Sequence, residues 1–223
     1  MIPHTLHFVW YERETPFSDW QLEAIKLALK NTTYDIFLHT NVPHKIPSLP
    51  RLTVKEYTFI EKNNIRACII CDIARLDIVG KYGGIYSDID FFWLKEWDLD
   101  KNLNLVAVYE NPSYKIVCNS VFACSPNTDF SVPIDLIKLE IEKIGEKDIT
   151  VFSVKNHLFG MKITGNYFKL KADCIENKRS KFFRNTWRKM ERGEPLNTDT
   201  TAIHLSATLG HTQKYFHTLK MLL

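Results

Sequence analysis

Short apolar runs separated by polar or turn-forming residues are the main pattern along the first two thirds of the chain. They predict strands at residues 5–10, 34–40, 85–94, 105–110 and 119–125. Residues 19–30 place Trp20, Ala24, Leu27 and Ala28 on one stripe and predict a helix. Helices are also expected at 66–82, which is almost wholly apolar and ends at Gly83 and Gly84, and at 132–145. Strands that alternate with helices indicate an α/β sheet.

Length and composition narrow the class of protein. The 223 residues suffice for one large domain, and 45% apolar with 25% charged residues is ordinary for a globular protein. A net charge of +3 is too small to suggest nucleic acid as a partner. We expect a cytoplasmic protein, because the sequence shows neither a signal peptide nor an apolar run of the roughly 18 residues that span a bilayer, and its five cysteines are irregularly spaced.

Two aspartates, Asp88 and Asp90, interrupt the otherwise apolar run at residues 85–94. On one continuous strand they would share a face. Two carboxylates about 6 Å apart repel by roughly 3 kcal/mol at an effective dielectric near 20, so a cation is expected beside them. A divalent ion with oxygen ligands fits that need. The alternative is that the strand ends at Ser87 and that both acids are solvated.

A second polar pair lies on the predicted helix 66–82. Asp72 and Arg75 are three residues apart and therefore share a face of that helix. Because the helix leads through Gly83 and Gly84 into the acidic segment, we expect both polar pairs to meet in one pocket. The alternative is a plain salt bridge between positions i and i+3, worth only tenths of a kcal/mol.

The stretch CDIARLDIVGKYGGIYSDID, residues 71–90, resembles the core signature of the family 32 glycosyltransferases. These DxD-containing enzymes are related to yeast α-mannosyltransferases and bacterial capsular sugar transferases, and the stretch is also similar to clostridial glucosylating toxins. The opening IPHTLHFVW resembles their first strand, and NSVFACSPNTDF, TGNYF and AIHLS resemble later segments more weakly. The resemblance implies a single GT-A domain with a Rossmann-like mixed sheet flanked by helices. Residues 1–110 would bind the nucleotide sugar, and residues 111–223 would form the acceptor side and C-terminal helices.

The same resemblance implies a reaction and a metal site. A hexose would move from a UDP- or GDP-linked donor to a glycan, lipid-linked or protein acceptor, with retention of configuration. Asp90 would bind Mn²⁺ or Mg²⁺ directly, and Asp88 would contact the ribose or, through water, the metal. His204 would offer a further metal or phosphate contact.

Four more residues receive roles from the resemblance. Asp72 and Arg75 would hydrogen-bond the donor hexose. Trp10 would stack on the base at the end of the first strand, and Asn119 would lie near the donor sugar.

Two other features have less specific interpretations. Residues 178–192 are rich in basic side chains, and we interpret them as a solvated helix or as a surface that contacts anionic lipid in a peripheral membrane contact. Cys68 and Cys71 form a CxxC within an apolar helix, which favours buried cysteines over a zinc site.

Two other functions also remain open from the sequence. An aspartyl-phosphate phosphatase also uses a DxD sequence, but it needs a small residue such as Thr where this chain has Phe92. A sugar-binding module without activity is the other alternative. A live transferase usually hydrolyses its donor slowly, and such a module would not.

Overall fold

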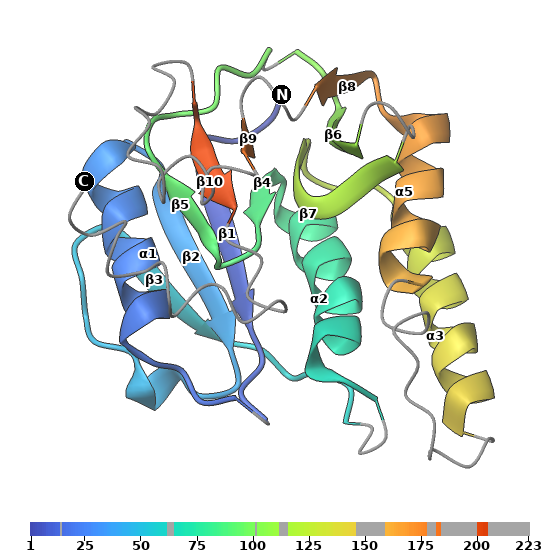
Figure 1. Cartoon of the computed structure of the whole chain (residues 1–223), viewed down its shortest axis with the longest axis horizontal. Coiled ribbons are helices and arrows are strands. Elements are labelled where there is room, and N and C mark those ends of the chain that lie inside the picture. Colours follow the sequence, from blue (N-terminus) through green and yellow to red (C-terminus); the bar gives the residue numbers. More distant parts are fainter. Residues whose placement is uncertain are drawn as a thin grey trace, which may run out of the picture.

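The computed structural model describes residues 1–13, 15–61, 65–100, 102–111, 116–145, 159–177, 182–183 and 200–204 (Figure 1). Its helices are α1 (Asp19–Asn31), α2 (Ala67–Tyr82), α3 (Ser131–Gly145), α5 (Phe159–Lys171) and the 3₁₀ turn η1 (Pro43–Lys45). Its strands are β1 (Thr5–Trp10), β2 (Asp35–Thr40), β3 (Leu52–Glu56), β4 (Gly84–Ser87), β5 (Phe91–Trp93), β6 (Leu105–Asn111), β7 (Ile116–Cys124), β8 (Cys174–Asn177), β9 (Phe182–Phe183) and β10 (Ala202–His204).

These strands form two sheets. The larger sheet has seven strands in the order β3-β2-β1-β4-β7-β6-β8, and the smaller has the order β5-β10-β9. Strands β3, β2, β1 and β4 run parallel to one another, whereas β7 is antiparallel to both β4 and β6. The described residues therefore form a mixed α/β sheet, as the sequence indicated.

Two apolar clusters cover the two faces of the larger sheet. Alternation along β1 directs Leu6 and Phe8 into the cluster that contains Ile25 of α1, while Val9 belongs to the cluster that contains Leu76 of α2. The second cluster also includes buried residues of α3 and α5. The sheet is thus covered by helices on both faces, which fixes the loops at its carboxyl edge.

Two glycines make the exit from α2 into β4 close-packed. Gly83 and Gly84 have φ angles of 70° and 98°, a region that residues with a Cβ rarely adopt. A Cβ on Gly83 would lie 2.6 Å from the backbone nitrogen of Pro126, and one on Gly84 would overlap the hydroxyl of Thr5. These contacts hold α2 and β4 in a fixed relation, so that Asp72, Arg75 and the DxD segment are placed together.

The expected single strand at residues 85–94 is wrong. Strand β4 ends at Ser87, and β5 begins at Phe91 in the other sheet. The carbonyl of Asp88 accepts a hydrogen bond from the Phe91 N–H at 3.1 Å, which closes a four-residue turn between the two strands. The other expected strands and the helices at 19–30, 66–82 and 132–145 are confirmed within a few residues.

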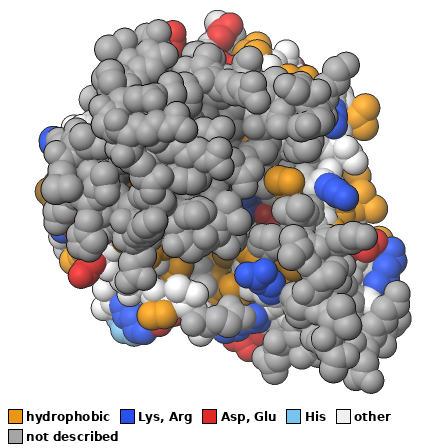
Figure 2. Space-filling view, in the orientation of Figure 1, with side chains coloured by type: hydrophobic (Ala, Val, Ile, Leu, Met, Phe, Trp, Pro, Cys, Tyr) orange, Lys and Arg blue, Asp and Glu red, His pale blue; other side chains and the backbone are white. Residues whose placement is uncertain are grey.

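Other expectations have mixed outcomes. No helix among the described residues is long and apolar enough to cross a membrane. Of residues 178–192, only Phe182 and Phe183 lie among the described residues, so both interpretations of that basic stretch stay predictions. On the face in Figure 2, acidic, basic and apolar side chains of the described residues are interspersed.

The CxxC pair contributes no recognised metal site. Cys68 and Cys71 are half-buried, and burial raises the pKa of their thiols to about 11 and about 12. Within the described part of the chain, neither cysteine belongs to a cluster of three metal-ligating side chains. Both cysteines are thus half-buried and not fully buried as expected, and the preference for packing over zinc stays a prediction.

We expect Gly84→Ala to lower the free energy of unfolding by more than about 2 kcal/mol, because alanine is strained at this φ and its Cβ overlaps Thr5. Lys81→Ala, at an exposed position of α2, is the control and should cost about 0.5 kcal/mol or less. Urea unfolding measures both. Equal stability of the two variants would show that the crowded exit from α2 does not constrain the fold.

Candidate active site at the carboxyl edge of the sheet

The polar residues singled out from the sequence lie at one edge of the larger sheet. The parallel strands β1 and β4 end there, at Trp10 and just before Asp88, and ligands of open α/β sheets bind outside such strand ends. The antiparallel β7 brings Asn119 to the same edge. Its neighbour Ser120 accepts a hydrogen bond from the Asp88 N–H at 2.8 Å.

The DxD segment is a turn between two sheets. The Asp88 carbonyl accepts hydrogen bonds from the Phe91 N–H at 3.1 Å and from the Ser87 hydroxyl at 3.0 Å. The side chain of Asp88 is 28% exposed and that of Asp90 only 9% exposed. The alternative that the strand ends at Ser87 is therefore confirmed, but its second part is wrong, because these carboxylates are not freely solvated.

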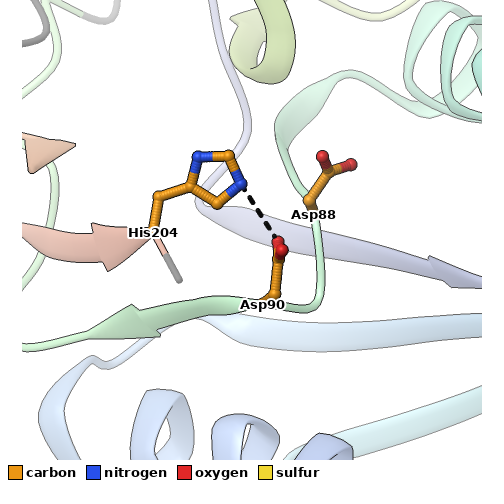
Figure 3. Close-up of side chains that lie close together, drawn as sticks. All are labelled: Asp88, Asp90 and His204. Atoms are coloured by element: carbon orange, nitrogen blue, oxygen red, sulfur yellow. Dashed lines mark ion pairs between the residues drawn. The ribbon is translucent and has the colours of Figure 1, made fainter. Parts of the chain in front are cut away.

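Asp88, Asp90 and His204 converge on one point (Figure 3). Each offers a ligand atom, and these atoms lie within 4.8 Å of one another. His204 Nε2 is 3.3 Å from Asp90 Oδ1, and its ring stacks on Phe91 at 4.2 Å. Two carboxylates and an imidazole are ligands that a divalent ion such as Mn²⁺ accepts, so the donor set fits the expected metal.

Pairing between β10 and β5 explains how His204 reaches this cluster from so far along the chain. His204 lies opposite Phe91 in the antiparallel pair, next to the end of the DxD turn. The smaller sheet thus supplies Asp90 and His204, while Asp88 follows a strand of the larger sheet.

Arg75 is the centre of a second, buried network. Its guanidinium contacts Asp72 Oδ1 at 3.1 Å and Asp88 Oδ1 at 3.0 Å, and it donates to the Asn119 carbonyl at 2.8 Å. The amide of Asn119 donates to Asp72 Oδ1 at 2.8 Å. The i,i+3 salt bridge of the alternative interpretation is therefore present, but it is buried, with Arg75 and Asp72 only 5% and 7% exposed, and it belongs to a larger network. The structure therefore brings the sugar-binding candidates and Asp88 together.

Burial dominates the titration of these carboxyl groups. It raises the pKa of Asp72 to about 6, although Arg75 acts in the opposite direction. It also raises the pKa of Asp88, again opposed by Arg75. A cation beside these groups would favour their charged form, which burial disfavours.

Two residues of the network were missed from the sequence. The Tyr86 hydroxyl donates to Asp88 Oδ1 at 2.6 Å, and its ring lies under the Arg75 guanidinium at 4.8 Å. Gly160, in the first turn of α5, faces Asp72 so closely that a Cβ would overlap its second carboxylate oxygen. Tyr86 could have been found from its position two residues before Asp88, whereas Gly160 had no signal in the sequence.

Trp10 lies at the same edge, where its ring packs on two other aromatic side chains. Its ring meets Phe17 and Trp20 edge to face at 6.2 and 6.1 Å. Its buried indole N–H has no hydrogen-bond partner among the described residues. The expected stacking on a base stays a prediction.

The chain is similar to known glycosyltransferases in sequence and in structure. Residues 15–107, which include the DxD turn, match the family described as "Glycosyltransferase sugar-binding region containing DXD motif". The solved structure of PaToxG glycosyltransferase is 14% identical and covers 98% of this chain and 78% of its own, with a TM-score of 0.50. An active-site mutant of LgtC is 14% identical, with coverages of 97% and 95% and a TM-score of 0.47. The sequence matches no curated protein.

We expect a pH dependence from Asp72. Because its pKa is raised from 3.8 to about 6, the folded state holds the proton between these values. Its contribution to the unfolding free energy is therefore largest below pH 3.8 and falls as the pH rises to about 6. The stability of the natural protein minus that of Asp72→Asn should fall over this range and then level off. Urea unfolding across pH measures it, and a difference that rises with pH would contradict the account.

Proposed function

We propose that this chain, whose residues 15–107 match a family of DXD-containing glycosyltransferases, moves a hexose from a UDP- or GDP-linked donor in a reaction that needs a divalent ion. The observation that carries the proposal is the convergence of Asp88, Asp90 and His204 within 4.8 Å. The proposal includes two features that resemblance to family 32 implies. These are retention of configuration and a glycan, lipid-linked or protein acceptor.

The metal would be Mn²⁺ or Mg²⁺, held by Asp90 and His204 with Asp88 beside them. When bound, such an ion supplies the positive charge that stabilises a leaving diphosphate. The protein's part is to fix the ligands before the donor arrives. The hydrogen bonds that close the DxD turn and the pairing of β10 with β5 fix these ligands, because both are contacts within the protein itself.

Asp72, Arg75 and Asn119 would hold the donor sugar. Their side chains are buried in one hydrogen-bonded network, so their orientation is fixed in advance. Groups that are already ordered lose little entropy when they bind hydroxyls, and they hold the anomeric carbon in place for attack. Trp10, at the end of β1, would support the base.

The family match favours a glycosyltransferase over the phosphatase alternative. Contacts at the turn support this, since a nucleophilic aspartate must be free to attack, whereas Asp88 is held by Arg75 and Tyr86. The inactive sugar-binding module is separated from an active enzyme by donor hydrolysis, which only the enzyme performs.

We expect Asp90→Ala to abolish hydrolysis of the donor that a screen of UDP- and GDP-sugars with Mn²⁺ identifies, because the metal loses a direct ligand. Asp98→Ala, at an exposed acid outside the cluster, is the matched control and should retain full turnover. Release of nucleoside diphosphate is the measurement. Full turnover by the natural protein in excess chelator would reject the metal requirement.

Ligands with and without the sugar should separate the roles of Trp10 and Asp72. Loss of stacking in Trp10→Ala should weaken binding of the nucleoside diphosphate and of the sugar nucleotide alike, by about 1–3 kcal/mol. Asp72→Ala should weaken binding of the sugar nucleotide and leave binding of the diphosphate nearly unchanged. Calorimetry with Mn²⁺ measures both ligands. If Trp10→Ala weakens only the sugar-bearing ligand, the ring does not lie under the base.

A further inference from the structure

A buried hydrogen bond spans the DxD turn from one side to the other. The indole N–H of Trp93 donates to the hydroxyl of Ser87 at 3.2 Å, and both residues are fully buried. The same hydroxyl donates to the carbonyl of Asp88 at 3.0 Å. Ser87 is the last residue before the two acids, and Trp93 closes the strand that follows them.

This hydrogen bond joins the two sheets. Ser87 ends β4 of the seven-stranded sheet, and Trp93 ends β5 of the three-stranded sheet. The candidate metal ligands are divided in the same way, with Asp88 after β4 and with Asp90 and His204 on the side of β5 and β10. Any shift of one sheet against the other would therefore change the spacing between the ligands.

We propose that Ser87 and Trp93 are positioning residues of the metal site. Their hydrogen bond holds the two sheets at the separation that lets Asp88 meet Asp90 and His204, although neither residue touches the ion. The inference rests on the proposed metal requirement and extends it to residues to which neither the sequence pattern nor the family match gives a role.

The Trp93 end of the bond is firmly anchored. Its ring packs edge to face on buried Tyr34 at 6.0 Å, and its carbonyl accepts a hydrogen bond from Asn31 of α1 at 3.0 Å. The next residue, Leu94, donates its N–H to the carbonyl of Thr201 at 2.8 Å, just before β10 begins. Trp93 is thus fixed to the core and to the strand that carries His204.

The Ser87 end depends on its hydroxyl. A buried strand position beside an apolar core would accept alanine, but the hydroxyl here both accepts one hydrogen bond and donates another. Without it, the indole N–H of Trp93 loses this acceptor inside the core, and the Asp88 carbonyl loses one of the two hydrogen bonds that it accepts among the described residues. The turn would then no longer be tied to Trp93.

Ser87→Ala, Trp93→Phe and the double variant test the hydrogen bond itself. Because both single changes break the same bond, the double variant should lose less stability than the sum of the two single losses, although Trp93→Phe also loses packing on Tyr34. Ser125→Ala and Trp97→Phe are matched controls, since they remove a hydroxyl contact to Asn104 and an indole bond to Glu176 away from the site. Their effects should add to those of Ser87→Ala.

Binding of the metal alone tests the positioning role. Free Mn²⁺ is counted by electron paramagnetic resonance, and Ca²⁺ is titrated calorimetrically. We expect Ser87→Ala and Trp93→Phe each to lower the affinity for Mn²⁺ about tenfold, as is typical when a residue that orients metal ligands is changed. The affinity for Ca²⁺ should fall less than about threefold, because Ca²⁺ accepts irregular coordination. The two controls should leave both affinities unchanged.

The outcomes separate this inference from the proposed function. If stability effects add, or if the ratio of Mn²⁺ to Ca²⁺ affinity is unchanged in both variants, the positioning role is rejected. If Mn²⁺ binding persists in those variants but is lost in Asp90→Ala, the metal site stands without this hydrogen bond. If the natural protein takes up no Mn²⁺, the proposed metal requirement fails and the positioning role fails with it, whatever the unfolding data show.

Discussion

The guanidinium of Arg75 lies between the buried carboxylate of Asp72 and the half-buried carboxylate of Asp88, and the rest of the site depends on that arrangement. It contacts Asp72 and Asp88 at 3.1 and 3.0 Å and is itself only 5% exposed. Removal of one partner from such a buried pair typically costs about 3–5 kcal/mol, because the remaining charge stays out of water. The close-packed exit through Gly83 and Gly84 allows this contact, since it fixes α2 against β4.

Arg75 also divides the acidic residues into two groups. It holds Asp72 and one oxygen of Asp88, which Tyr86 also contacts, while Asp90 faces His204. One side of the edge is therefore a rigid, internally satisfied network suited to hydroxyl groups. The other side keeps carboxylate and imidazole atoms close together, where a divalent ion would lower their mutual repulsion. Asp88 belongs to both sides and, on the proposed function, would connect the donor sugar with the metal ion.

Much of this could be read from the sequence because the information is local. The alternation of strands and helices, the shared face of Asp72 and Arg75, and the Gly-Gly exit all depend on residues close in the chain. The resemblance to family 32 suggested a role for His204, which spacing alone could not connect with Asp90. The structure supplies the physical link, since β10 pairs with β5 and places His204 opposite Phe91.

The error at residues 85–94 has a definite cause. Apolar residues flank the acids on both sides, so the pattern matches one buried strand, yet those residues are buried in two different sheets. Periodicity records burial and not which sheet provides it. For the same reason, the contact of Gly160 with Asp72 and the bond from Trp93 to Ser87 could not be read from the sequence. Each depends on tertiary packing between separate elements.

The central claim is that the DxD turn and His204 form one metal site. The most direct test is a crystal grown with Mn²⁺ and a nucleoside diphosphate, with diffraction measured at the manganese absorption edge. The account predicts an anomalous peak within coordinating distance of Asp90 and His204, with the diphosphate bound to the same ion. A peak at any other place, or a diphosphate bound at this edge with no metal beside Asp90, would contradict it.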